Sequence, residues 1–189
     1  MRIIAGEARG RKLFAPRDES IRPLLDQIRE SIFSSLGELF VGGRVIDLFC
    51  GVGSFGLEAL SRGASHAVFV DISSSSLSIL KRNLSNLGFE GRAQVLRGDA
   101  LRVPGLDTDG EPTFRVAFLD PPFKMFAHLE LANAVFDRVR RICGGPCLDP
   151  DGVILLRHPS KLTVESRLTP CARKVYGEST VLWFRANSK

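Results

Sequence analysis

Short β-rich runs with little polar alternation recur along this 189-residue chain, and they constrain its fold more than any other feature. Two of them are residues 44–49 and 67–71, and others lie near 93–97, 115–119 and 152–157. Strands that are buried on both faces, as in a parallel sheet, have this composition. Helical patterns separate the runs, so the sequence predicts a doubly wound α/β sheet.

The segments between these runs carry the features of helices. Residues 55–62 form one predicted helix, and leucines at helical spacing after Ser73 form a second. A third helix is expected near 127–142. The last two runs, 173–176 and 180–185, are separated by a short turn and predict a hairpin. The expected sheet is therefore seven-stranded and mostly parallel, with an antiparallel hairpin at its C-terminal end.

The N-terminal part of the chain is expected to extend the same domain. Residues 1–40 form this extension, and residues 41–189 form the main body of the domain. A helix is expected within the extension, because apolar residues recur there at helical spacing. Its predicted buried side carries Ile28, Ile32, Leu36 and Phe40.

The net charge of +5 is concentrated at the two ends of the chain. Residues 1–13 carry a net +3 and residues 157–189 a net +5, which leaves −3 for the middle. Basic ends around a mildly acidic centre suggest that a polyanion binds the termini, although a solvated basic surface gives the same pattern.

Cellular location and metal content are constrained by what the sequence lacks. No run approaches the roughly 20 apolar residues of a membrane span, and the first residues do not resemble a signal peptide. Four scattered cysteines predict reduced thiols rather than a disulfide framework. We therefore expect a cytoplasmic protein that contacts no membrane and holds no metal.

The first predicted strand leads into a glycine-rich loop. Gly51, Gly53 and Gly56 have the spacing G-x-G-x-x-G, which fits a dinucleotide site and also a plain tight turn. Asp47 precedes these glycines and would repel a pyrophosphate but attract an ammonium group. S-adenosylmethionine carries an ammonium group and no phosphate, so Asp47 favours it as the ligand.

Aspartates close four successive predicted strands, at the edge where open α/β sheets bind ligands. They are Asp47, Asp71, Asp99 and Asp120. Asp71 is expected to accept hydrogen bonds from the ribose hydroxyls, and Asp99 from the adenine amino group. Neighbouring residues complete the predicted cofactor site: Phe49, Gly51, Gly53, Ile72 and Ala100.

The segment Asp120-Pro121-Pro122-Phe123 follows the fourth predicted strand. Two prolines fix the backbone and remove two amide donors, which leaves a carboxylate, free carbonyls and an aromatic ring. An exocyclic base amine is a poor nucleophile because its lone pair is delocalised into the ring. Asp120 and the Pro121 carbonyl can accept its N–H groups, and Phe123 can stack on the base. These four residues therefore predict methyl transfer to an exocyclic base nitrogen.

Together these motifs resemble the bacterial 16S rRNA (guanine-N2) methyltransferase family over nearly the whole chain. The N-terminal motifs are the most specific: Ile3-Ile4-Ala5-Gly6, Arg9-Gly10-Arg11-Lys12-Leu13, and Arg22-Pro23 with Asp26, Arg29 and Glu30. The resemblance implies the class I methyltransferase fold, S-adenosylmethionine as methyl donor and a guanine 2-amino group as acceptor. It also implies that basic N-terminal residues contact RNA: Arg2, Arg9, Arg11, Lys12, Arg22 and Arg29.

Three positions depart from the family pattern. Leu24 stands where a threonine is usual, Asp71 where a glutamate is usual, and Phe123 where a tyrosine is usual. The last two substitutions keep the chemistry that the site needs. Leu24 leaves the start of the N-terminal helix without a capping hydroxyl.

Other functions fit part of the pattern. The tetrapeptide serves any exocyclic base nitrogen, so an amino-methyltransferase acting on adenine, or on another RNA or DNA, is an alternative. A non-catalytic RNA-binding assembly factor of the same fold is a second. A nicotinamide oxidoreductase is a third, disfavoured because no proton-relay motif accompanies the glycine loop. The expected partner is 16S rRNA or an assembly intermediate of the small subunit, bound by a monomer.

Overall fold

A computed structural model describes residues 1–15, 22–103, 113–162 and 168–186, and the side chains of residues 22–25 lie outside this description. The strands are β1 (Arg44–Leu48), β2 (His66–Asp71), β3 (Ala93–Arg97), β4 (Phe114–Leu119), β5 (Leu148–Pro159), β6 (Ala172–Tyr176) and β7 (Ser179–Arg185). The helices are α1 (Arg22–Leu36), α2 (Ser54–Ser61), α3 (Ser74–Leu87) and α4 (Leu129–Gly144), with short 3-10 helices η1 (Glu90–Arg92) and η2 (Phe123–Ala127).

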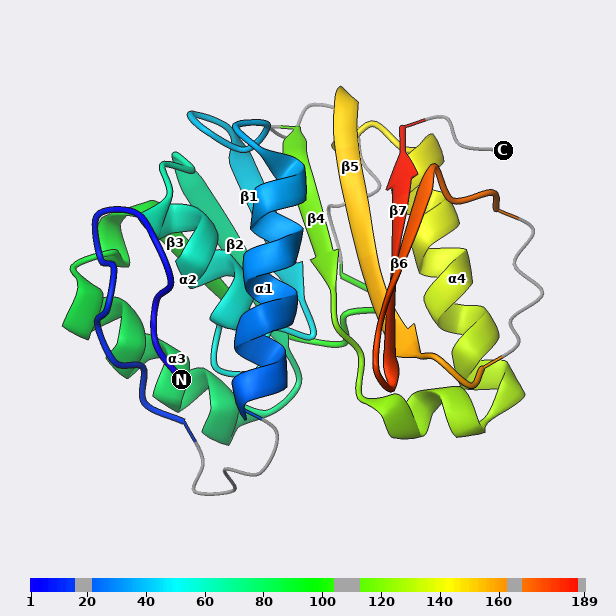
Figure 1. The fold of residues 1–189 in the computed structure, drawn as a ribbon, viewed down its shortest axis with the longest axis horizontal. Coiled ribbons are helices and arrows are strands. Elements are labelled where there is room, and N and C mark those ends of the chain that lie inside the picture. Colours follow the sequence, from blue (N-terminus) through cyan, green and yellow to red (C-terminus); the bar gives the residue numbers. More distant parts are fainter. Residues whose placement is uncertain (16–21, 104–112, 163–167, 187–189) are drawn as a thin grey trace.

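The described strands form one seven-stranded sheet in the order β3-β2-β1-β4-β5-β7-β6. Strands β1 to β5 pair in parallel, whereas β7 is antiparallel to both of its neighbours. The carboxyl ends of β4 and β5 point to the lower edge of the molecule as drawn in Figure 1. The predicted fold class, a mostly parallel seven-stranded sheet with a C-terminal hairpin, is confirmed.

Helices cover both faces of the sheet, which explains why its strands are apolar on both sides. Helices α1, α2 and α3 pack with one core cluster, to which β1 contributes Val45. Helix α4 packs with a second cluster, to which the same strand contributes Ile46 and Leu48. Figure 1 shows α1 in front of the sheet and α4 behind it. Residues that alternate along one strand therefore serve two separate cores.

The N-terminal segment is fastened to α2 by a buried carboxylate. Glu58 has no exposed surface. Its side chain accepts the backbone N–H groups of Ile4 at 2.8 Å and Ala5 at 3.0 Å. It also pairs with the Arg62 guanidinium at 2.7 Å. One helix turn further on, the Ser61 hydroxyl donates to the Ala5 carbonyl at 2.6 Å. The first residues of the chain are thus hydrogen-bonded to the helix that follows the glycine loop.

Three element boundaries differ from those that the sequence predicts. Helix α1 ends at Leu36, so Phe40 lies beyond it. The Phe40 side chain is nevertheless buried, and its ring packs edge-on against the Phe33 ring with 5.4 Å between the ring centres. Strand β5 begins at Leu148, four residues before the predicted run. A 3-10 turn occupies residues 123–127, so α4 starts later than predicted. Among the described residues, no helix has the length and apolar character to cross a bilayer.

Candidate cofactor and acceptor site

A cavity of about 610 Å³ lies at the carboxyl edge of the parallel strands, a size usual for small-molecule sites, which span roughly 300–1,000 Å³. One part of its wall comes from the loops after β1, β2 and β3. That part holds six residues of the predicted cofactor site: Phe49, Gly51, Asp71, Ile72, Asp99 and Ala100. Another part comes from the segment after β4 and holds Asp120, Pro121 and Pro122. The fold therefore brings both predicted sites to one cavity.

Asp71 joins two of the loops that line this cavity. One of its carboxylate oxygens accepts the Gly51 N–H at 2.8 Å, and the other accepts the Ser73 N–H at 2.8 Å. Ser73 in turn caps α3, because its hydroxyl accepts the Ser76 N–H at 3.2 Å. The Asp71 carboxylate is thereby held in a fixed orientation at the cavity wall.

An apolar side chain and a second carboxylate lie beside Asp71. Ile72 is 69% exposed, although it directly follows a buried strand. An adenine ring placed in the cavity would cover this surface, and burying such a side chain stabilises a complex by about 1.5–3 kcal/mol. Asp99 accepts the Leu101 N–H at 2.9 Å, which orients its carboxylate at the same wall. Acids for hydroxyl and amino groups beside an apolar surface fit an adenosyl ligand such as S-adenosylmethionine.

Asp47 does not face the cofactor cavity, contrary to the prediction from its place before the glycine loop. Its side chain is 1% exposed and lies beneath the glycine loop, not on the cavity wall. One carboxylate oxygen accepts the Gly56 N–H at 2.9 Å, and the other is buried without a hydrogen-bond partner among the described residues. The reason is strand alternation, since Asp47 shares the α2-facing side of β1 with Val45. Asp47 therefore satisfies a free N–H in the first turn of α2 instead of facing an ammonium group.

Gly53 also lies outside the cavity wall. It precedes α2 with a φ of 88°, in the left-handed region that favours glycine. A Cβ at this position would lie 2.4 Å from Cδ1 of Leu80 on α3. The structure thus assigns Gly53 to the close packing of α2 against α3, whereas Gly51 lines the cavity.

Burial gives Asp47 a pH-dependent effect on stability. Loss of hydration raises the pKa of its carboxyl from 3.8 to about 8. A raised folded-state pKa favours folding below the unfolded value of 3.8, and this contribution is lost as the pH rises toward 8. Asp47→Asn keeps an acceptor for the Gly56 N–H and removes the charge. From pH 5 to pH 8, we expect the free energy of unfolding of the variant to rise by at least about 1 kcal/mol relative to that of wild type.

Urea unfolding of both proteins at pH 5 and pH 8 measures this difference. Asp149→Asn, near the amino end of β5 where the Asp149 side chain is 23% exposed and pairs with Arg115, serves as the control and should show the same stability difference at both pH values. A stability difference for Asp47→Asn that does not change with pH would contradict the assignment.

Asp120 pairs with Arg157, a residue of the basic C-terminal region that belongs to no predicted site motif. The Arg157 guanidinium donates through Nε to Oδ1 of Asp120 at 2.7 Å. The Arg157 guanidinium also lies over the Phe123 ring, 4.7 Å from its centre. Strand register explains the contact, because Leu119 of β4 pairs with Leu156 of β5, which places the next residues side by side. Phe123 itself does not line the large cavity.

Most of the predicted RNA-contacting residues lie on the surface. Arg2, Arg9, Arg11 and Lys12 are exposed on the N-terminal segment, where a backbone bridge joins Arg2 to Lys12. Arg29 differs, since it is only 1% exposed. Its guanidinium donates to the Arg2 carbonyl at 2.7 Å and to Asp26 at 2.8 Å. Burial lowers the pKa of the Arg29 guanidinium. Its hydrogen bond to the Arg2 carbonyl holds the N-terminal segment against α1. The Arg22 side chain lies outside the described residues.

Comparison with known proteins covers nearly the whole chain. Residues 1–185 match the family model described as Conserved hypothetical protein 95. A protein of Bacillus subtilis (strain 168), provisionally named rRNA methyltransferase YlbH, is 36% identical over 188 residues, which cover 98% of each chain. Ribosomal RNA small subunit methyltransferase D of Escherichia coli (strain K12) is 36% identical over 137 residues, 72% of this chain and 67% of its own length.

A solved structure extends the likeness to the fold. The provisionally assigned methyltransferase yhhF of Escherichia coli aligns with a TM-score of 0.78 at 29% identity, covering 100% of this chain and 99% of that one. The resemblance to small-subunit rRNA methyltransferases that the sequence motifs indicate is confirmed by these relatives. The chain belongs to the family described as Conserved hypothetical protein 95.

Proposed function

We propose that this protein transfers a methyl group from S-adenosylmethionine to the exocyclic N2 of a guanine in 16S rRNA. The observation that carries the proposal is the shared cavity, which Asp71, Asp99 and Asp120 all line. A cofactor held by the first two carboxylates would lie beside the carboxylate that receives the amine. The relatives named as ribosomal RNA methyltransferases support rRNA as the substrate.

The residues after β4 provide the acceptor chemistry. S-adenosylmethionine, when bound, would supply the methyl group by cleavage of its sulfonium C–S bond and would leave as S-adenosylhomocysteine, and the amine nitrogen would release one proton as its bond to the methyl carbon forms. Asp120 accepts one N–H of the amine and the Pro121 carbonyl accepts the other, so the nitrogen lone pair is directed at the methyl group. Apolar side chains of Met125 and Leu131 line the same cavity and keep water from the reacting atoms. The rate gain arises mainly from positioning and charge complementarity.

The choice of guanine rests on the family resemblance, because the tetrapeptide serves any exocyclic base amine. Small-subunit rRNA is the substrate named for the Escherichia coli relative. The proposed location is the cytoplasm, where ribosomal subunits assemble, and the proposed working form is a monomer bound to the small subunit or its precursor.

Transfer of tritiated methyl groups from S-adenosylmethionine tests the proposal directly. The protein is incubated with 16S rRNA, either naked or in assembled 30S particles, and the labelled nucleosides are separated after digestion. We expect label in N2-methylguanosine. Label in N6-methyladenosine would refute the guanine assignment, and the absence of label in every RNA would refute the enzymatic function.

The exposed basic residues of the N-terminal segment give a second test. Replacing Arg9, Arg11 and Lys12 with glutamine should weaken RNA binding, because each cation that contacts a phosphate releases a counterion. The slope of log affinity against log salt concentration should fall by about 2, at roughly 0.7 per contact on single-stranded RNA. Arg140 and Arg141 on α4, replaced in the same way, serve as the matched control. An unchanged slope in the triple variant would place RNA binding elsewhere.

A further inference from the structure

A chain of hydrogen bonds crosses three strands of the sheet behind the candidate acceptor site. It begins at Ser179 on β7, whose hydroxyl oxygen accepts from Nη1 of Arg157 on β5 at 3.2 Å. Arg157 in turn donates through Nε to Oδ1 of Asp120, just after β4, at 2.7 Å. The guanidinium is therefore held from both sides. Its planar shape makes this possible, because separate nitrogens of one rigid group form the two bonds.

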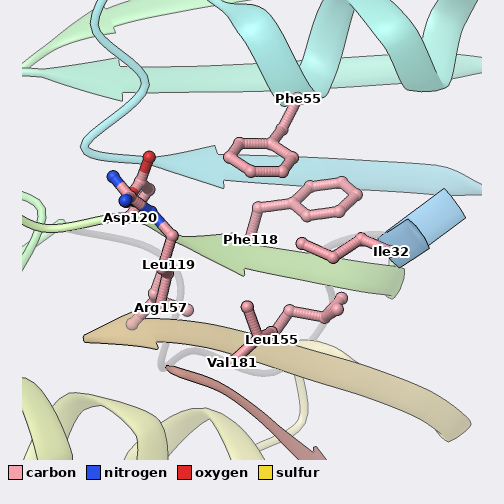
Figure 2. A pocket seen from close by; sticks show the side chains of 8 residues that line it. All are labelled: Ile32, Phe55, Phe118, Leu119, Asp120, Leu155, Arg157 and Val181. Carbon is pink, nitrogen blue, oxygen red and sulfur yellow. The ribbon is translucent and has the colours of Figure 1, made fainter. Parts of the chain in front are cut away.

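The environment of the ion pair strengthens it. The side chains of Arg157 and Asp120 are 16% and 21% exposed. Behind them lies a second, small cavity of about 10 Å³, barely large enough for one water molecule. Figure 2 shows its lining, in which Phe55, Phe118 and Ile32 project from different elements and the ion pair lies at one end. A charge pair against such an apolar wall is less screened than one in water.

The same guanidinium also supports the aromatic ring of the tetrapeptide. It lies over one face of Phe123, 4.7 Å from the ring centre, a distance typical of cation–π contacts. The ring is thereby in contact with the cation on one face. Arg157 therefore contacts both side chains to which the proposed mechanism gives a role in holding the acceptor, the carboxylate and the ring.

We propose that Arg157 is a positioning residue of the acceptor site. It fixes Asp120 through Oδ1, so that Oδ2 is directed to the amine, and it holds the Phe123 ring as a stacking surface. Its positive charge also offsets the repulsion between the Asp120 carboxylate and the phosphates of incoming RNA. This inference rests on the proposed function and adds to it a residue that the tetrapeptide motif does not contain.

Substitutions that remove the donors one at a time test the role. Arg157→Met keeps an unbranched apolar side chain, shorter than that of arginine, and loses both hydrogen bonds. We expect kcat to fall about 10- to 100-fold, the effect of losing a charge-assisted hydrogen bond at a reacting group. The dissociation constant for S-adenosylmethionine and the KM for RNA should each change less than about threefold. Arg157→Lys, which can reach only one partner, should recover part of the loss, and Ser179→Ala should show a smaller loss than Arg157→Met.

Arg115→Met is the matched control. Arg115 also lies on a central strand and pairs with a carboxylate, Asp149, at 3.5 Å, but this pair is remote from the cavity. Its kcat should equal that of wild type. Circular dichroism and the affinity for S-adenosylmethionine show whether each variant is folded. A kcat that rises in Arg157→Met would mean that Arg157 blocks the acceptor site, and a kcat that is unchanged would mean that it does not act there. Either result overturns the proposal.

A measurement without RNA separates this inference from the proposed function. In ¹⁵N spectra of the free protein, slowed solvent exchange of the Arg157 Nε–H reports its bond to Asp120, and Asp120→Ala should abolish the slowing. Rapid exchange in wild type would refute the ion pair. A wild-type protein with slowed exchange that methylates no RNA would refute the proposed function, and the role of Arg157 in it, while the ion pair itself would stand.

Discussion

Asp120→Ala is expected to lower kcat for methyl transfer by at least about 10³-fold, the size of effect seen when a group that acts on the reacting atoms is removed. The substitution removes the carboxylate that accepts the amine N–H, and it also leaves the Arg157 guanidinium without its partner at the cavity wall. The unpaired positive charge of Arg157 would then lie near the position of the acceptor amine and would disfavour the electron-rich nitrogen that methyl transfer requires. The loss is therefore expected in the chemical step and not in cofactor binding.

Two measurements separate these steps. Single-turnover methyl transfer gives the rate of the chemical step, and titration calorimetry gives the affinity for S-adenosylmethionine, which should stay within a few-fold of wild type. Asp149→Ala, whose carboxylate pairs with Arg115 away from the cavity, serves as the control and should retain full turnover. Full turnover in Asp120→Ala would eliminate the proposed role of the tetrapeptide.

Glu58→Ala is expected to cause the largest loss of stability, about 3–5 kcal/mol, as is usual when one partner of a buried ion pair is removed. The substitution leaves the N–H groups of Ile4 and Ala5 without acceptors and the Arg62 guanidinium without its counterion. The nearby buried Arg29 loses a favourable charge as well. The N-terminal segment should detach from α2 before the sheet unfolds.

Urea unfolding monitored by circular dichroism measures the loss, and hydrogen exchange at the Ile4 and Ala5 amides reports the detachment. Glu38→Ala, at an exposed position beyond α1, is the control and should change stability by less than about 0.5 kcal/mol. A loss below about 1 kcal/mol in Glu58→Ala would show that the N-terminal segment is held mainly by its apolar contacts.

The sequence predicts the parallel part of the fold well because burial on both faces leaves a clear mark on composition. The runs that became β1 and β2 contain almost no exposed positions. The serine cap and glycine end of α3, at Ser73 and Gly88, are equally local features that can be recognised in the sequence. The end of α1 was misplaced because Phe40, although apolar and at helical spacing, is buried by a turn that packs its ring on Phe33.

The site was predicted less completely, because its contacts depend on which strands are neighbours. Asp71, Asp99 and Asp120 line one cavity because each lies at or just beyond the carboxyl end of a parallel strand. Asp47 lies one residue before the end of β1, and alternation turns it away from the cavity. Arg157 is 37 residues from Asp120 in the chain. Only the pairing of β4 with β5 brings the two together, and no local pattern encodes that pairing.

The attachment of the N-terminal segment to α2 has a consequence for how a substrate would be chosen. The basic residues of that segment are joined through Glu58 to a helix that starts at the glycine loop. The basic residues proposed to contact RNA and the acceptor site would thus lie in one rigid body, separated by a fixed length. A folded RNA would then be modified where the distance between its backbone and a protruding base matches this fixed length, whatever the neighbouring nucleotide sequence.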